Sequence, residues 1–205
     1  MMYKLIIITG QSGAGKTELA LKFKSSLDEW RIVSQDNFCN DRNNLLNSND
    51  FFSLNHELPN IINHDKAYQA IMMLLNGCRA DVPKYIHRLL RSEGLTSVPG
   101  GSVLYEGLHA FYDKRIRDLS SLNVFLDTPF ELALERRLKR DLNNSIDNES
   151  KMMNYIKNTV YSNYLEYVEP LKIHADIILD GRMTVNETCD YLVNYFNDHQ
   201  EFLKC

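Results

Sequence analysis

The chain has 205 residues, of which 44% are hydrophobic and 24% are charged, and its formal net charge is −4. This length and composition are typical of one globular domain with a substantial core. The net charge excludes a broad basic surface, so we expect no nucleic-acid partner.

Cysteine usage and hydropathy predict the compartment. The four cysteines are scattered, with no CxxC pair and no metal-like spacing with histidine, which is typical of reduced thiols in a cytosolic protein. The first apolar run is too short for a signal peptide or a membrane span. We therefore expect a cytoplasmic protein that does not bind a membrane.

The most specific motif lies in the first seventeen residues. Residues 3–9 form an apolar run rich in β-branched side chains, which predicts a buried strand, and a helical stretch follows from Glu18 to about Leu27. Between them the pattern G-x-x-x-x-G-K-T predicts a loop whose backbone N–H groups bind nucleotide phosphates. We expect Lys16 to reach the outer phosphates and Thr17 to offer its hydroxyl to Mg²⁺. The loop consists of Gly10, Gln11, Ser12, Gly13, Ala14, Gly15, Lys16 and Thr17.

A second predicted strand, over 31–35, leads directly to Asp36. Ligands of open α/β sheets bind outside the carboxyl ends of the strands. Asp36 therefore lies beside the phosphate loop if the first two strands are near each other. Its position leaves two interpretations open: a general base or magnesium ligand, or an aspartate that begins a turn.

Residues 39–60 are rich in Asn, Asp and Ser and predict a partly helical insertion. His56 and His64 lie near it, and surface histidines are the commoner interpretation. A helix is expected over 67–75, followed by an extended piece over 82–86 whose proline is typical of an edge. A basic group there either holds a phosphate or forms a solvated face: Lys84, His87, Arg88 and Arg91.

Glu106 follows a predicted strand over 102–105 and precedes a glycine. An acid in this place either binds Mg²⁺, directly or through water, or caps the local backbone. The next strand, over 122–127, leads into a helix with a leucine face. Its basic side chains either close over phosphates or are simply solvated: Arg136, Arg137, Lys139 and Arg140.

The remaining chain predicts a long helix over 149–168 that ends at Pro170, a strand over 175–179 and a closing amphipathic helix over 185–196. Predicted strands thus alternate with helices. This pattern indicates an α/β fold with a central parallel sheet of about five strands flanked by helices. No internal repeat is present, so we expect a single domain over residues 1–205.

Several further segments follow in a fixed order: Ser34-Gln35-Asp36-Asn37-Phe38, Asn63-His64-Asp65-Lys66-Ala67-Tyr68, Tyr105-Glu106-Gly107-Leu108-His109, Phe125-Leu126-Asp127-Thr128, Arg136-Arg137-Leu138-Lys139-Arg140-Asp141 and Ala175-Asp176-Ile177-Ile178. With the phosphate loop, they resemble the phosphoribulokinase/uridine kinase family over most of the chain. The resemblance implies the fold of P-loop nucleoside kinases. It also implies an acceptor-binding insertion at about 39–97 and a helical lid at about 136–150.

The resemblance also implies a role for individual residues. Asp36 would accept the proton of a substrate hydroxyl that attacks the γ-phosphorus of ATP. Thr17 and Glu106 would hold Mg²⁺. In the lid, Arg140 would contact the nucleotide phosphates and Arg137 would touch both lid and substrate. The residues implied for the acceptor pocket are Asp36, His64, Tyr85, Leu108 and Arg137.

The chain departs from the uridine kinases in its lid and acceptor pocket. Those enzymes carry Arg-Gly-Arg-Asp where this chain has Ser145-Ile146-Asp147-Asn148, so two guanidinium groups are missing. The aspartate before the family histidine is Asn63, the aromatic after the base segment is Cys39, and Lys84-Tyr85-Ile86-His87 looks like the phosphoribulokinase branch.

We therefore expect an ATP-dependent small-molecule kinase, with the 5′-hydroxyl of uridine or cytidine as the favoured acceptor. One alternative is a kinase of a sugar phosphate or a vitamin-like alcohol such as pantothenate or nicotinamide riboside. The other is a catalytically weak ATP-binding regulator. Uridine kinases often assemble as tetramers, so a homo-oligomer is an open option, although no sequence feature indicates an interface.

Overall fold

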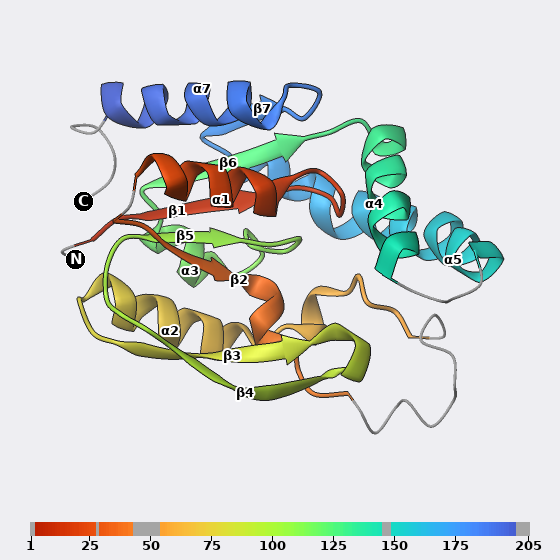
Figure 1. The fold of residues 1–205 in the computed structure, drawn as a ribbon, viewed down its shortest axis with the longest axis horizontal. Coiled ribbons are helices and arrows are strands. Elements are labelled where there is room, and N and C mark those ends of the chain that lie inside the picture. Colours follow the sequence, from red (N-terminus) through yellow and green to blue (C-terminus); the bar gives the residue numbers. More distant parts are fainter. Residues whose placement is uncertain (1–2, 28, 43–53, 145–148, 200–205) are drawn as a thin grey trace.

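A parallel sheet of five strands forms the centre of the protein, in the order β2-β5-β1-β6-β7 (Figure 1). The computed structural model describes residues 3–27, 29–42, 54–144 and 149–199. The strands are β1 (Leu5–Thr9), β2 (Arg31–Ser34), β5 (Val103–Glu106), β6 (Leu122–Asp127) and β7 (Ile177–Asp180). All five residues of β1 are buried because helices cover both faces of the sheet, which explains its unbroken apolar run. The predicted α/β fold is confirmed.

Asp36 was expected beside the phosphate loop if the first two strands lay near each other, but the order of strands in the sheet separates them. Strand β5 lies between β1 and β2, so that Tyr105 is paired with Ile7 on one side and with Val33 on the other. The first two strands are therefore not neighbours. Because all three strands are parallel, their carboxyl ends still meet at one edge of the sheet. The phosphate loop and the turn that carries Asp36 both leave from this edge.

Helices cover the two faces of the sheet (Figure 1). Helices α1 (Lys16–Ser26) and α7 (Val185–Asp198) pack on one face, where Phe23, Trp30 and Phe196 meet edge to face with ring centroids 5.3–6.3 Å apart. Helices α2 (His64–Leu75) and α3 (Lys114–Leu119) pack on the other face. Each face has its own hydrophobic cluster, as expected for a layered α/β protein.

A two-stranded antiparallel hairpin lies beside α2, outside the central sheet. It consists of β3 (Ala80–Ile86) and β4 (Arg91–Val98). The extended piece at 82–86 was predicted, but β4 was not, because its side chains are mostly polar or exposed and give no apolar alternation. The pairing shifts register between Pro83 and Tyr85, where proline provides no N–H for the ladder.

Two helical segments stand beyond the end of the sheet. The first is α4 (Phe130–Asn144), in the predicted lid, and the second begins with α5 (Glu149–Tyr155). The predicted single helix over 149–168 is instead interrupted by π-helical turns at Ile156–Val160 and Tyr164–Val168, on either side of the short α6 (Tyr161–Asn163). A 3₁₀ segment, Glu169–His174, then continues the helical path past Pro170.

Across the part of the chain that the structure describes, no helix is long and apolar enough to cross a membrane.

Candidate active site

The loop between β1 and α1 has the backbone that phosphate binding requires. Gly13 and Gly15 have φ angles of +87° and +100°, in the left-handed region that favours glycine. A Cβ on Gly13 would lie 2.1 Å from the carbonyl oxygen of Ala133, so only glycine lets α4 approach the loop this closely. Gly15 directly precedes α1, whose N-terminal N–H groups and dipole favour an anion.

Lys16 is the first residue of α1, and its side chain is buried. Its Nζ donates a hydrogen bond to the carbonyl oxygen of Gln11, 3.0 Å away, across the phosphate loop. Burial lowers the pKa of Lys16, while the carboxylates of Glu106 and Asp36 act in the opposite direction. The cation therefore lies inside the loop and within electrostatic reach of both predicted acidic site residues.

Glu106 ends β5 at the carboxyl edge of the sheet, in register with Ile8 of β1 and Ser34 of β2. Its side chain is buried, and burial raises the pKa of its carboxyl, while Lys16 and hydrogen bonds with Ser34 and Thr17 lower it. A carboxylate and a hydroxyl that already share a hydrogen bond are oxygen ligands of the kind that Mg²⁺ prefers.

The side-chain oxygens of Thr17 and Glu106 fit a magnesium ion whose other ligands do not come from the protein. No group of three or more His, Cys, Asp or Glu side chains that could hold a metal is present among the described residues. Mg²⁺ commonly binds through one or two protein oxygens and fills its octahedron with water and substrate phosphates. Thr17 and Glu106, next to the phosphate loop, match that requirement.

Asp36 lies in the 3₁₀ turn after β2, Gln35–Phe38, and pairs with His87. Their Oδ2 and Nε2 atoms are 3.4 Å apart, and each side chain is more than half exposed. Desolvation raises the pKa of Asp36, but the hydrogen bond and charge of His87, with Lys16 and Arg140, lower it further, so that the net shift is downward. Asp36 is therefore a carboxylate at neutral pH and has oxygens that can accept a proton.

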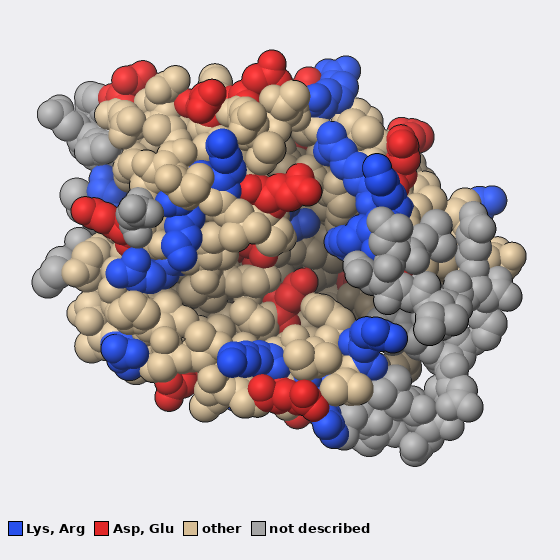
Figure 2. Space-filling model, viewed as in Figure 1, with Lys and Arg blue, Asp and Glu red and all other residues tan. Residues whose placement is uncertain are grey.

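A cleft with about 360 Å³ of open space lies beside Asp36. Its lining residues come from the end of β2, the predicted insertion and the segment after β5, and they are Gln35, Asp36, Cys39, Arg42, His56, Ile61, Ile62, His87, Leu108 and His109. Figure 2 shows a hollow on the face viewed, with acidic side chains inside it and basic side chains on both sides. Burial raises the pKa of the Cys39 thiol to about 12, so this cysteine presents a neutral surface to the cleft.

Arg42 gives the cleft a cation that sequence reasoning did not predict. Its Nη1 donates to the carbonyl oxygen of Asn55 at 3.2 Å, and its Nη2 lies 3.0 Å from Nδ1 of His56. Its Nε is buried and has no hydrogen-bond partner. Within the described residues no carboxylate forms an ion pair with Arg42.

Three of the residues implied for the acceptor pocket, His64, Tyr85 and Arg137, do not line this cleft. Tyr85 is buried in β3, with its ring 5.2 Å from that of His87, and burial raises the pKa of its hydroxyl. His64 begins α2, stacks on Tyr112 with ring centroids 5.2 Å apart, and places Nε2 3.0 Å from the carbonyl oxygen of Pro59. Asp36 and Leu108, by contrast, lie in the lining.

The two arginines of the predicted lid have different surroundings. Arg137 is largely buried, and its Nη2 donates to Oε1 of Glu57 at 2.8 Å. Arg140 is exposed, its Nε is 2.8 Å from Oδ1 of Asp141, and its charge acts on both Lys16 and Asp36. Residues 145–148, where the family's further arginines are missing, lie outside the described residues.

Comparisons with known proteins show the family to which the chain belongs. The family model described as "Phosphoribulokinase / Uridine kinase family" matches residues 5–188. The chain belongs to this family.

Two relatives named uridine kinase cover most of both chains. The one from Borrelia duttonii is 28% identical over 180 residues, which are 87% of this chain and 86% of that one. The one from Haemophilus influenzae is 30% identical over 183 residues, 85% of each chain. A solved structure described as a possible uridine kinase from Bacillus stearothermophilus has a TM-score of 0.61 at 19% identity, with 88% of this chain and 90% of that chain covered.

Membership of the phosphoribulokinase/uridine kinase family makes this protein a kinase with a small-molecule substrate. The site brings together groups of the kinds that phosphoryl transfer uses: a phosphate loop with its lysine, oxygens that could hold Mg²⁺, a carboxylate beside a cleft and arginines of the predicted lid. These parts come from four segments of the chain that lie far apart in sequence and meet at one edge of the sheet.

Glu57 and His109 join these segments, and sequence reasoning did not identify either one. Nε2 of His109 donates to the carbonyl oxygen of Glu57 at 2.8 Å, and its backbone N donates to Oε1 of Gln35 at 2.8 Å. Burial lowers the pKa of His109 to about 4, so the ring is neutral. His109 stands in a matched segment, but Glu57 gave no signal because its partner is 80 residues away.

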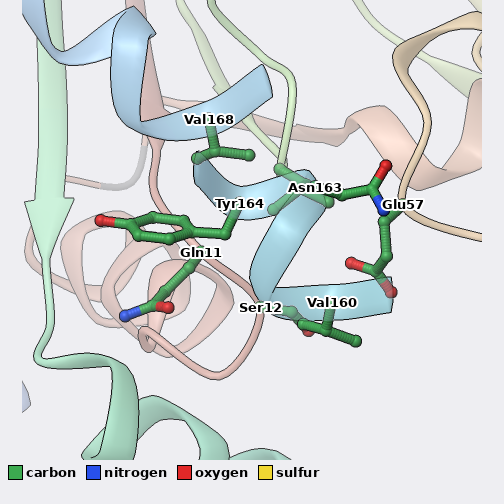
Figure 3. Close-up of a pocket in the computed structure, with 8 residues that line it drawn as sticks. Gln11, Ser12, Glu57, Val160, Asn163, Tyr164 and Val168 are labelled. Carbon is green, nitrogen blue, oxygen red and sulfur yellow. The ribbon is translucent and has the colours of Figure 1, made fainter. Parts of the chain in front are cut away.

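A second, smaller cavity of about 200 Å³ lies between the phosphate loop and the π-helical segment (Figure 3). Glu57 and Asn163 lie on one side of it in the close-up, and Gln11 and Tyr164 lie on the other. Leu108, in the segment after β5, lines both spaces.

Proposed function

We propose that this protein transfers the γ-phosphoryl group of Mg-ATP to a hydroxyl group of a small molecule, with Asp36 as general base. The observation that carries the proposal is that Lys16 after β1, Asp36 after β2 and Glu106 at the end of β5 all stand at the carboxyl edge of the same parallel sheet. Donor phosphates, metal and acceptor hydroxyl would then meet there.

The proposed reaction assigns a task to each of these groups. Asp36 accepts the proton of the acceptor hydroxyl, and the hydroxyl oxygen forms a bond to the γ-phosphorus while the bond to the β–γ bridging oxygen breaks and ADP leaves. Lys16 and the loop N–H groups bind the phosphates, and Arg140 adds positive charge on the lid side. Thr17 and Glu106 would hold Mg²⁺, which neutralises charge on the phosphate oxygens.

The favoured acceptor is the 5′-hydroxyl of uridine or cytidine. The support is the name of the relatives, uridine kinase, together with the matched segments at Asp36 and Glu106. We further propose that the insertion at about 39–97 forms the acceptor side of the site and that the lid at about 136–150 closes over the phosphates.

A second acceptor class is favoured by a specific observation. Arg42 brings a guanidinium into the cleft that has no ion-pair partner among the described residues, and His87 stands directly beside Asp36. A phosphate or carboxylate on the acceptor would neutralise that charge, because guanidinium groups bind such anions through paired hydrogen bonds. Sugar phosphates and carboxylated alcohols are therefore the alternative substrates.

The test is acceptor-dependent ADP release with Mg-ATP. The panel contains uridine, cytidine, other nucleosides, ribulose 5-phosphate, pantothenate and nicotinamide riboside. Turnover of uridine or cytidine supports the favoured acceptor, and turnover only of a phosphorylated or carboxylated alcohol supports the second class. Mg-ATP binding without turnover of any acceptor contradicts the proposal and favours a regulatory protein.

A Lys16→Ala variant serves as the control for the site of binding. Loss of a charge-assisted hydrogen bond costs about 1.5–3 kcal/mol, so Mg-ATP affinity should fall roughly tenfold to a hundredfold. Unchanged affinity would contradict the assignment of the phosphate loop.

A further inference from the structure

Residues 55–57 of the predicted insertion contact three other parts of the molecule. Nδ2 of Asn55 donates to Oδ1 of Asn163 at 3.3 Å, and the backbone N of His56 donates to the hydroxyl of Tyr155 at 2.9 Å. The carbonyl oxygen of Glu57 accepts from His109 at 2.8 Å. This short segment therefore fixes the insertion to the helices that follow α4 and to the segment after β5.

The side chain of Glu57 adds an ion pair with α4. Its carboxylate is 6% exposed, the guanidinium of Arg137 is 12% exposed, and Oε1 and Nη2 are 2.8 Å apart. Burial disfavours both charges, but the pairing keeps the pKa of Glu57 lowered and that of Arg137 raised, so both groups are ionised. The hydroxyl of Tyr155 donates to the same Oε1 at 3.4 Å.

Arg137 lies next to the phosphate loop. A Cβ on Gly13 would lie 3.3 Å from the Cβ of Arg137, so the stem of the arginine contacts the loop backbone. Glu57 lines the cavity that also touches Gln11 and Ser12 of the loop (Figure 3). The ion pair therefore lies at the place where loop, insertion and lid meet.

The guanidinium of Arg137 makes a hydrogen bond at only one of its nitrogens, Nη2, which binds Glu57. Nε lies 3.4 Å from Oδ2 of Asp141, within the range of an ion pair but without a hydrogen bond. Nη1 is also buried, and among the described residues it has no hydrogen-bond partner. Buried N–H donors are normally satisfied, so an unsatisfied one beside a phosphate loop indicates a donor that is ready for a ligand oxygen.

We infer that Glu57 is a positioning residue for phosphoryl transfer: it holds Arg137 so that the free Nη1 faces the oxygen of the group being transferred or of the acceptor. The inference rests on the proposed function and extends it to a residue outside the matched segments. Geometry matters at this point because a shift of about 1 Å in a group that contacts the reacting atoms can reduce the rate about 100-fold.

A purely structural role for the pair predicts something different. A buried ion pair is weak evidence for stability, because the cost of desolvating two charges offsets their attraction. If Glu57 only tied the insertion to α4, its replacement would lower thermal stability and leave the turnover of the folded protein unchanged. The two roles can therefore be separated by measuring kcat and stability on the same variants.

The experiment compares Glu57→Gln, Glu57→Asp and the wild type, with Glu135→Gln as the control, since Glu135 is an exposed glutamate on the same helix as Arg137. The assay uses the acceptor that the wild type turns over. We expect kcat to fall about 100-fold in Glu57→Gln and about tenfold in Glu57→Asp, with the KM for ATP within about twofold of wild type. Glu135→Gln should match the wild type in both quantities.

A second readout needs no acceptor. The Nε–H signal of Arg137 in a ¹H–¹⁵N spectrum, assigned with Arg137→Lys, should be sharp in the wild type and broadened in Glu57→Gln. If no acceptor is turned over by the wild type, the proposed function fails while this signal still tests the positioning. If Glu57→Gln does not fold, Glu57→Asp retains the charge and carries the test. Wild-type kcat and an unchanged Arg137 signal in the folded variants would overturn the inference.

Discussion

The phosphate-loop half of the protein and its acceptor half are built in different ways. The first half consists of β1, α1 and their sheet neighbours, and its contacts are mostly apolar packing on the two faces of the sheet. The second half consists of the predicted insertion, the β3–β4 hairpin and the helical segments from α4 to the 3₁₀ segment Glu169–His174. There, α2, β3 and the helices after α4 also have apolar clusters, but long-range hydrogen bonds and ion pairs such as Glu57–Arg137 and Asp36–His87 join the segments around the site.

Apolar packing and polar contacts suit different tasks. Apolar packing fixes backbone positions rigidly, which suits a loop that must present its N–H groups to phosphates without rearrangement. Polar contacts depend on single side chains. In the proposed function the phosphate-loop half binds the donor phosphates, and the sequence departs from the uridine kinases outside that half, in the predicted lid and acceptor pocket.

The largest expected effect is a loss of kcat on substitution of Asp36, in the turn after β2. Asp36→Asn removes the proton acceptor and should lower kcat roughly 10²–10⁴-fold, the contribution of a general base, while Mg-ATP affinity stays near that of wild type. Steady-state kinetics and equilibrium binding of Mg-ATP measure the two quantities. Asp81→Asn, an exposed carboxylate in β3, is the matched control. Wild-type turnover in Asp36→Asn would refute the base assignment.

The next effect concerns stability and belongs to the phosphate-loop half. Phe23 is fully buried between α1 and α7, so Phe23→Ala should lower the free energy of unfolding by about 3–5 kcal/mol. Urea denaturation of the variant gives the value. Leu21→Ala, on the exposed side of the same helix, should change stability by less than about 0.5 kcal/mol. Equal effects of the two substitutions would contradict the assignment of the buried face.

A smaller effect, visible only in acid, tests the contact of His109 with the insertion. Its pKa is about 4 in the folded protein against 6.5 for the ordinary side chain, so the unfolded chain binds the extra proton between these pH values. Stability should therefore fall as pH drops from 6.5 to 4, by about 1.4 kcal/mol per pH unit from this group alone. Above pH 6.5 the histidine contributes no pH dependence.

The variant His109→Gln has no group that titrates in this window. Its free energy of unfolding, measured by urea denaturation at several pH values, should depend less steeply on pH between 4 and 6.5 than that of wild type. Parallel curves for the two proteins would show that His109 is not buried in its neutral form.

The smallest effect is expected in the hairpin. Leu95 in β4 is 61% exposed, so Leu95→Ser should change stability by less than about 0.5 kcal/mol and leave the KM for ATP unchanged. A loss of several kcal/mol, or a concentration-dependent change in stability, would indicate that β4 is covered by another surface in solution. Thermal unfolding at two protein concentrations distinguishes these outcomes.

The sequence predicted the phosphate-loop half well because its signals are local. An apolar run, a glycine-rich turn and a helix follow one another within residues 3–27, and each is fixed by short-range sterics and burial. The five parallel strands and the closing helix were found in the same way. Their order in the sheet was not, because the insertion of β5 between β1 and β2 depends on the packing of segments about 70 residues apart.

The acceptor half was predicted less well, for a related physical reason. Strand β4 is mostly exposed and polar, so it lacks the alternation that marks a strand. Arg42 and Glu57 lie in a polar stretch, and only their distant partners reveal a role. The segment after Tyr155 has a helical sequence pattern, and its residue types do not distinguish the hydrogen bonding of π-helical turns from that of an α-helix. The roles assigned to Asp36, Glu106 and the lid arginines remain predictions for the experiments above.

The position of β5 has a consequence for the size of the reaction space. Neighbouring strands lie about 4.8 Å apart, so two spacings, or about 10 Å, separate the axes of β1 and β2. The phosphate loop follows β1, the turn with Asp36 follows β2, and Glu106 ends β5, which lies between these two strands. A donor oxygen, a phosphorus atom and an attacking oxygen must fit in line within that span. The hydrogen-bond spacing of a β-sheet, a constant of protein backbones, thus sets the width of the space in which the transfer would take place.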